Sequence, residues 1–373
     1  MDDTRNQTPD WPDPSTGPDP DAARLAATIA LLNEADGPAD EAGGWPESLW
    51  RIVVELGAPR WSLPAEFGGD ACDRPTLARR YAKVAEGSLT AAFILTQHDA
   101  AVRRLVPAAT AGRGQAAAWL AKIADGQAFT TVGISQLTTS RRHGQAALVA
   151  TETADGYRVD GVIPWVTAAP SASVLVTGAV LADGRQLLIA LPTDRPGLTV
   201  RDPFPLAALQ ASSTCEITCE GVPVTSADLL AGPILDVLAT SDGGGTGGLE
   251  TSALALGQAR AALVALADQA GRREDLTEPV DALADSWRLL AADLLAASEG
   301  RADAPPSARI RGSANTLVLR ATQAYLTARK GSGFLRTDPA QRWARQALFF
   351  LVWSCPAPVA HASIRDLAGL CST

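Results

Sequence analysis

The stretch DGVIPWVTAAPSASVLVTG, residues 160–178, is the part of the sequence that decides the fold. Its apolar residues alternate with small or polar ones, and a Pro-Ser turn separates two such halves, which is the pattern of consecutive β-strands. Trp165 and Thr167 stand two residues apart, and side chains at that spacing point to the same face of a strand. We therefore predict a β unit that presents an indole and a hydroxyl together.

The character of the chain changes on either side of this stretch. Short β-type segments separated by Ala-Asp-Gly turns continue over residues 129–224. Helical periodicity precedes this region, as in AARLAATIALL at 22–32, and returns afterwards in four long apolar patterns between 249 and 354. Because no strand–helix–strand alternation occurs, a Rossmann core is excluded. The sequence predicts an α+β protein that is mostly α.

These changes divide the chain into four parts. A disordered, acidic and proline-rich tail is expected at 1–20, followed by an N-terminal helical domain at 21–126. A small central β-sandwich or barrel is expected at 127–228, and a C-terminal four-helix bundle at 229–373. The tail has no apolar stretch, so we expect neither a signal peptide nor an anchor there.

Composition narrows the possible partners. The 373 residues are 46% hydrophobic and carry a net charge of −9 without a run of Lys or Arg, which argues against nucleic acid and against an anionic membrane surface. No apolar run approaches the roughly 20 residues that span a bilayer. Five irregularly spaced cysteines indicate a reducing compartment, so we expect the cytoplasm. Cys215 and Cys219 lack a second ligand pair, and no metal site is predicted.

Motifs for phosphate binding or hydrolysis are weak. The glycine-rich run at 242–248 lacks the Lys-Ser/Thr of a P-loop and is interpreted as a connection between domains. His98, His143 and His361 lie far apart in the sequence, and no nucleophile elbow accompanies them. We therefore expect neither a nucleotidase nor a hydrolase.

Several stretches, taken in order, resemble the acyl-CoA dehydrogenase family. The strand around Trp165 is similar to the family's flavin-facing strand of the type G-x-K-x-W-I-T. The resemblance runs from about residue 21 to the end, and it implies an N-terminal helical domain, a central β domain and a C-terminal bundle. The other stretches that carry it are LWRIVVELGAPRWSLPAEFGG (49–69), LQASSTCEITCEGVPV (209–224), LALGQARAALVALADQAGRR (254–273) and KGSGFLRTDPAQRWARQA (330–347).

The resemblance implies a flavoprotein that binds FAD between the β domain and the bundle, as a homodimer or homotetramer. Trp165 would lie beside the flavin ring, and the Thr167 hydroxyl would donate a hydrogen bond to it. The loop GISQLTTS at 133–140 stands where the family has T-E-P-x-x-G-S, a loop that meets the flavin. Its candidate contacts are Leu137, Thr138 and Ser140.

A further cofactor contact is implied at the end of the first bundle helix. Arg273 aligns with an arginine that reaches the FAD pyrophosphate of a partner subunit, although a helix C-terminus favours arginine in any case. The Phe and Gly that follow this arginine in the family are absent here. Lys330 also replaces the first glycine of the family's Gly-Gly-x-Gly-Tyr turn, and Thr327 replaces a glutamine that contacts the cofactor. These departures place the affinity for FAD in doubt.

The family's catalytic glutamate is missing from its usual position. Counting from Arg345, Trp353 stands at the family's tyrosine and Ser354 at the glutamate that removes the α-proton of the acyl thioester. A serine hydroxyl is too weak a base for that step. Some relatives carry the glutamate at the start of the first bundle helix, which makes Glu250 the substitute candidate. Glu250 can also be read as an ordinary carboxylate at a helix N-terminus.

Two alternatives to dehydrogenation of an acyl-CoA or acyl-carrier-protein thioester remain open. Some relatives are monooxygenases that receive reduced flavin, such as FMN, from a reductase and place serine and histidine near it. His98 and His361 are the candidates for that chemistry, and each is also compatible with a surface or core role. The second alternative is a relative that kept the fold as an acyl or flavin binder without catalysis. The sequence does not identify the electron acceptor or the reductase.

Overall fold

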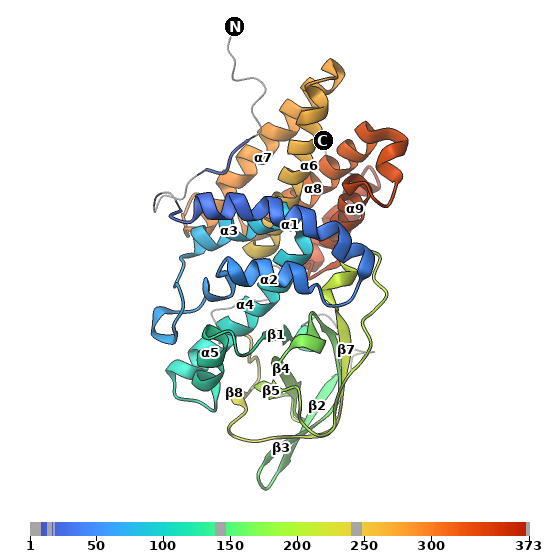
Figure 1. The fold of residues 1–373 in the computed structure, drawn as a ribbon. Coiled ribbons are helices and arrows are strands. Elements are labelled where there is room, and N and C mark those ends of the chain that lie inside the picture. The colour runs from blue at the N-terminus through green and yellow to red at the C-terminus, as the bar shows by residue number, and fades with distance from the viewer. Residues whose placement is uncertain (1–8, 13–16, 18, 139–146, 240–247, 371–373) are drawn as a thin grey trace.

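The computed structural model describes residues 9–12, 17, 19–138, 147–239 and 248–370. Figure 1 shows a β-sheet at one end of the molecule, a helical bundle at the other and the N-terminal helices between them. This is the mostly α, α+β architecture that the sequence predicts. No helix in the described ranges is long and apolar enough to cross a membrane. Ser140 and His143 lie outside these ranges.

The N-terminal domain is helical, and its helices cover both the sheet and the bundle. Helix α4 begins at the N-cap Ser88, whose hydroxyl accepts a hydrogen bond from the amide of Ala91 at 3.1 Å. Its apolar residues Ala101, Val102 and Leu105 share a core with strand residues of the sheet. The helices are α1 (Ala22–Ala42), α2 (Glu47–Glu55), α3 (Arg74–Gly87), α4 (Leu89–Thr110) and α5 (Ala116–Ala124).

The strands form one mixed sheet in the order β6-β7-β3-β2-β4-β5-β8, and β1 pairs with β4 in parallel. Side chains from both halves of this order, such as Ile163, Leu175 and Ile217, share one core, so the sheet curves over its own apolar face. The strands are β1 (Thr130–Gly133), β2 (Leu148–Thr153), β3 (Gly156–Val166), β4 (Val174–Val180), β5 (Gln186–Pro192), β6 (Leu198–Val200), β7 (Cys215–Val224) and β8 (Leu229–Ile234).

The β unit is longer than the predicted boundary at residue 228. Strand β8 pairs with β5 through Leu229, Ala231 and Ile234, so the sheet continues six residues past that boundary. Strand β8 contains Gly232 and Pro233, which the last strand of a sheet tolerates because its outer edge needs no hydrogen bonds to a neighbouring strand.

The bundle differs from the prediction at its last helix. The apolar pattern from 339 to 354 predicts one helix, but α9 ends at Ala347 and the chain bends at Trp353, where the backbone becomes extended (φ −76°, ψ 122°). Gly257 lets α6 approach α3 closely, because a Cβ there would lie 2.0 Å from the carbonyl oxygen of Ala82. The bundle helices are α6 (Leu249–Ala270), α7 (Thr277–Ser298), α8 (Ser307–Arg329), α9 (Pro339–Ala347), α10 (Phe349–Val352) and α11 (Ala357–Leu367).

The expectation of a disordered tail at 1–20 is wrong for its described residues. Trp11 is 6% exposed and its ring meets Trp287 of α7 edge-on, with centroids 4.6 Å apart. Asp19 is buried and accepts hydrogen bonds from Arg80 of α3 at 2.6 and 2.7 Å. An aromatic anchor and a buried ion pair supply the contacts that the polar composition of this segment did not suggest.

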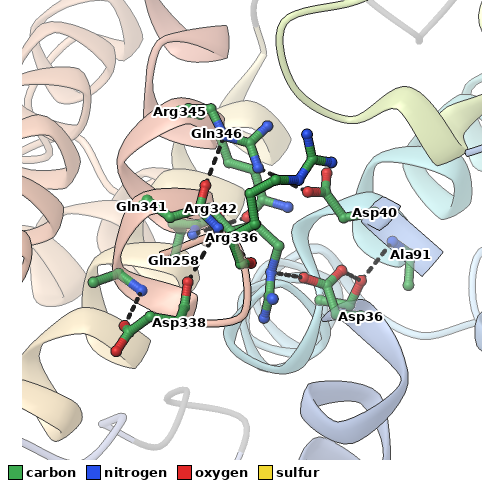
Figure 2. Close-up of polar contacts among 12 residues, drawn as sticks. Asp36, Asp40, Ala91, Gln258, Arg336, Asp338, Gln341, Arg342, Arg345 and Gln346 are labelled. Atoms are coloured by element: carbon green, nitrogen blue, oxygen red, sulfur yellow. Dashed lines mark hydrogen bonds and ion pairs between the residues drawn. The ribbon is translucent and has the colours of Figure 1, made fainter. Parts of the chain in front are cut away.

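Ion pairs fasten α9 to α1. Figure 2 shows Asp36 facing Arg342 and Asp40 facing Arg345, at 2.8 Å in each pair. Arg345 also donates to the carbonyl oxygen of Ala207 at 2.9 Å, which ties the segment before β7 to the same helix. The arrangement fixes α9, and with it the start of α10, against the N-terminal domain.

Candidate functional site

A cavity of about 560 Å³ lies where the N-terminal helices, the sheet and the bundle meet. One face of α4 forms a wall, and the ends of β1 and β3 form another. The first turn of α6 and the segment from α9 to Ser354 complete the lining. Cavities of this size that lie between domains and carry few polar groups are the usual sites for small ligands and cofactors.

The wall on α4 follows from helical periodicity. Phe93, Thr96, Gln97, Ala100 and the pair Arg103–Arg104 recur every three or four residues, so they lie on one face of the helix and all line the cavity. The face is apolar or neutral near Phe93 and cationic near the arginines. A ligand would therefore meet apolar groups at one end of this wall and positive charge at the other.

Trp165 lies where the sequence predicts a ligand contact. It lines the cavity and is 39% exposed, although its strand neighbours Pro164 and Val166 are buried. Its indole meets Phe204 at a centroid distance of 4.8 Å and Trp353 at 6.4 Å. These neighbours hold the ring in place while its remaining surface faces the cavity.

The Thr167 side chain does not line the cavity beside Trp165. Strand β3 ends at Val166, and its pairing with β7 shifts register between Ile163 and Val166, so the alternation that placed Thr167 beside Trp165 does not extend to it. The Thr167 side chain is buried, and its hydroxyl lies 3.2 Å from that of Thr214, which does line the cavity. Thr214 immediately precedes β7, and the sequence analysis missed it because a lone threonine before a strand carries no distinguishing signal.

The loop after β1 contributes different residues from those expected. Ile134 and Ser135 line the cavity, whereas Leu137 is buried in the core beside the sheet and Thr138 donates to the carbonyl oxygen of Ser135 at 3.2 Å. The Ser135 hydroxyl is buried and has no hydrogen-bond partner among the described residues. A buried hydroxyl without a partner at a cavity wall is suited to a ligand that accepts or donates a hydrogen bond there.

These groups fit a flavin. Its tricyclic ring offers an aromatic face to an indole and carbonyl and ring nitrogen atoms to hydroxyl groups. Trp165 supplies the exposed indole, and Ser135 and Thr214 supply hydroxyls on the same cavity wall. The residues present are therefore compatible with a flavin ring against the ends of β1 and β3.

Glu250 and Arg103 form an ion pair on the cavity wall. Glu250 lies in the first turn of α6, and its carboxylate oxygen is 3.4 Å from the Arg103 guanidinium of α4. Burial opposes the charge on Arg103, but Glu250, Tyr81 and Asp99 together raise its pKa above the usual value. The ion pair orients the Glu250 carboxylate at the cavity wall.

Ser354 also lines the cavity, at the bend after α10. Its φ of +43° lies in the left-handed region that serine rarely adopts. The carbonyl oxygen of Trp353 accepts a hydrogen bond from Arg311 at 3.0 Å, which fixes the backbone at this bend. The serine that stands at the family's glutamate position thus belongs to the same cavity as Glu250 and Trp165.

The candidate histidines do not line this cavity. His98 is 1% exposed, and its Nδ1 lies 3.0 Å from Asp99 within a cluster of Trp50 and Phe129 rings. His98 occupies the face of α4 opposite to the cavity wall. His361 is exposed on α11. The arrangement gives neither imidazole access to a flavin placed against Trp165.

Arg273 lies beyond the opposite end of α6 from Glu250, a helix about 33 Å long. It pairs with Asp275 at 2.7 Å and donates to the carbonyl oxygen of Ala328 at 3.1 Å. Its contact with a partner subunit's cofactor stays a prediction.

Burial raises the pKa of Cys215 to about 11 and that of Cys219 to about 12, which leaves both thiols protonated. No group of potential metal ligands occurs in the described part of the chain.

Known proteins resemble this chain in sequence and in fold. No family model matches it. It is 30% identical over 250 residues to a Bacillus subtilis protein named "Probable acyl-CoA dehydrogenase YngJ", a match that covers 65% of this chain and 64% of that relative. Butyryl-CoA dehydrogenase from Megasphaera elsdenii superposes with a TM-score of 0.77 at 17% identity, covering 93% of this chain and 99% of the other.

TdsC from Paenibacillus, solved with FMN and indole, superposes with a TM-score of 0.73 at 19% identity, covering 94% of this chain and 96% of the other. The fold therefore occurs in proteins that bind different ligands, and the match to the Bacillus relative spans less than two thirds of that protein's length. Sequence and fold nevertheless point to the same family. The chain is similar in sequence to acyl-CoA dehydrogenases and shares their fold.

Proposed function

We propose that this protein is a flavin-dependent oxidoreductase that removes two hydrogens from an acyl thioester, with Glu250 as the base. The observation that carries the proposal is the joint presence of Trp165, Glu250 and Ser354 on one cavity. The cavity provides an aromatic contact at Trp165 and a carboxylate at Glu250. Ser354, which the sequence analysis aligns with the family's catalytic glutamate, provides no carboxylate. An activated carbon acid needs a base, and Glu250 is the carboxylate that lines this cavity in the part of the chain that the structure describes.

Trp165, Ser135 and Thr214 would hold the flavin, which we take to be FAD. The indole would contact the ring, and the Ser135 hydroxyl would gain the hydrogen bond that it lacks. A bound flavin supplies the acceptor for the hydride that leaves Cβ of the substrate. The chain's own residues would position the ring and keep water from its edge.

The face of α4 near Phe93 would bind the acyl chain. Phe93 packs edge-on against Phe349 and Trp353, with centroids 4.9 and 4.7 Å apart, so this wall is rigid and apolar. An acyl chain gains from burial against such a surface. The carrier of the thioester, coenzyme A or an acyl carrier protein, would remain outside the cavity.

Glu250 would take the α-proton. The thioester carbonyl makes that proton acidic, and a carboxylate is ionised near neutral pH and can accept it. Arg103 holds the Glu250 carboxylate from one side at 3.4 Å, which leaves its other oxygen for the substrate. As the proton moves to Glu250 and the hydride leaves Cβ, a double bond forms between the two carbons. Ser354 cannot replace the carboxylate, because an alcohol is too weak a base.

The test is the rate of anaerobic flavin reduction by acyl-CoA thioesters in Glu250→Gln, measured by stopped-flow absorbance. Loss of a general base lowers the rate by about 10²- to 10⁴-fold. The matched control is Glu278→Gln, which changes an exposed glutamate in the first turn of the neighbouring helix α7. Its rate should equal that of the wild type.

Equal rates for Glu250→Gln and the wild type would reject Glu250 as the base. Bound flavin that no thioester reduces would reject the dehydrogenase proposal. In that case, consumption of dioxygen with externally supplied reduced FMN would favour the monooxygenase alternative, and no reaction with either would favour a binding role.

A further inference from the structure

Among the described residues, three arginines line the cavity, and two of them have carboxylate partners. Arg345 pairs with Asp40 at 2.8 Å, and Arg103 pairs with Glu250 at 3.4 Å. Arg104 lines the same cavity but forms no ion pair with any described residue. Glu250 attracts Arg104 as well as Arg103, but one carboxylate shared by two guanidinium groups leaves this part of the described cavity wall with one positive charge in excess.

Arg104 is also buried. The residue is 5% exposed, and its Nη1 donates to the carbonyl oxygen of Ala100, one turn earlier in α4, at 2.7 Å. Its Nε is inaccessible to solvent and has no hydrogen-bond partner among the described residues. Burial, followed by repulsion from the neighbouring Arg103, lowers the pKa of Arg104 to about 10, against an attraction to Glu250 that raises it, and the group stays charged near neutral pH.

A buried guanidinium without a counter-ion is costly, and proteins rarely keep one without a purpose. In this cavity a bound ligand can supply the missing negative charge. A guanidinium presents planar, paired donors that match the two oxygens of a carboxylate. A single unbalanced positive charge also matches the single negative charge of a carboxylate better than the pyrophosphate of a coenzyme A carrier.

We propose that the acyl group of the substrate carries a second, free carboxylate, and that Arg104 binds it. The inference rests on the proposed function, because it assigns a substrate class to the same cavity. Arg103 and Glu250 would stay paired, so that Arg104 alone selects for the anionic acyl group. The apolar wall around Phe93 would contact the uncharged part of the ligand.

The first test compares thioesters that differ only at the end of the acyl chain: glutaryl-CoA with pentanoyl-CoA, and succinyl-CoA with butanoyl-CoA. Dissociation constants are measured by calorimetry on the flavin-loaded full-length protein, so that the readout does not depend on turnover. The wild type should bind at least one dicarboxylic thioester about ten- to a hundredfold more tightly than its matched partner, as expected for a charged hydrogen bond.

Arg104→Met should remove that preference without weakening the binding of pentanoyl-CoA, and Arg104→Lys should retain part of it. If the wild type binds each dicarboxylic thioester no more tightly than its monocarboxylic partner, the inference is overturned. Equal weakening of both members of a pair in Arg104→Met would assign Arg104 to the carrier or to the fold. Weaker flavin binding with an intact preference would assign it to the cofactor. Either of these results also overturns the inference.

A second measurement does not depend on thioester binding. Phenylglyoxal that enters the cavity can modify guanidinium groups on its wall, and the slow modification expected at the 5%-exposed Arg104 can be followed by mass spectrometry of the full-length protein. Free glutarate should slow this modification several-fold, whereas the neutral isostere glutaramide should not. If no thioester binds but glutarate protects Arg104, the proposed function fails and the carboxylate site stands. If both compounds protect equally or neither protects, the carboxylate site fails.

Discussion

Two pairs of arginines in this molecule differ in the carboxylates that they meet. On α9, Arg342 and Arg345 each meet a carboxylate of α1 at 2.8 Å, in contacts that fasten two parts of the fold (Figure 2). On α4, Arg103 meets a carboxylate across a cavity, and Arg104 meets none in the described chain. The comparison teaches that the residue type does not separate a structural arginine from a ligand-binding one. The partner does.

The largest expected effect is on the α9 group. Arg342→Met removes one member of a pair whose side chains are 8% and 2% exposed, and leaves the Asp36 carboxylate buried without its counter-ion. Loss of one member of a buried pair lowers the free energy of unfolding by roughly 3–5 kcal/mol. Urea denaturation measures this loss of free energy of unfolding. The double variant Asp36→Asn with Arg342→Met should lose less free energy of unfolding than Arg342→Met alone. An unchanged stability in Arg342→Met would contradict a structural role for this ion pair.

A smaller effect is expected at the indole on the cavity wall. Trp165→Ala removes an aromatic contact to the flavin, and stacking of this kind is worth roughly 1–3 kcal/mol. Fluorescence titration of the flavin-free protein with FAD should therefore give about five- to 150-fold weaker binding. Trp119→Ala, on α5 and outside the cavity lining, is the control. Equal affinities for the two variants would contradict the placement of the flavin.

The ion pair between Arg80 and Asp19 can be tested through the pH dependence of the free energy of unfolding. Burial opposes the charge of Asp19, but hydrogen bonds from Arg80 outweigh it and hold the pKa of Asp19 below its usual 3.8. A lowered pKa contributes stability that is present above about pH 4 and is lost as the pH falls through the lower folded value. The stability difference between wild type and Asp19→Asn should therefore shrink between pH 6 and pH 3. A constant difference over this range would contradict the pairing.

The smallest effect on stability is expected at Arg104. Because this guanidinium has no counter-ion in the described chain, Arg104→Met should change the free energy of unfolding by less than about 1 kcal/mol or should raise it. The same denaturation experiment compares it directly with Arg342→Met, a substitution of the same type. A loss as large as that of Arg342→Met would show that Arg104 has a structural partner.

The order of the elements and the general position of the site follow from the sequence, but the contacts that complete them do not. Periodicity predicts the helices and strands, and the exposed Trp165 appears where its strand pattern suggests. Thr167 and Thr138 are displaced because strand β3 ends at Val166 and the loop after β1 turns early. The sequence carried no signal for Arg103 and Arg104, because only the tertiary structure brings them to the cavity and shows which of them has an ion-pair partner.

The missing glutamate illustrates the same limit. Counting along the chain identifies Ser354 at the usual position, but it leaves Glu250 about one helical turn from the position where some relatives carry the base. The structure brings both residues to one cavity, because Arg103 of α4 holds Glu250 from the opposite side. A contact between residues 147 positions apart cannot be read from local spacing.

The most direct test of the account is the visible absorption spectrum of the purified protein during anaerobic addition of acyl-CoA thioesters. The account predicts a bound, oxidised flavin whose absorbance near 450 nm falls when a thioester that fits the cavity is added, and a much slower fall in Glu250→Gln. A protein that binds no flavin, or a bound flavin that keeps its absorbance with every thioester, would contradict it.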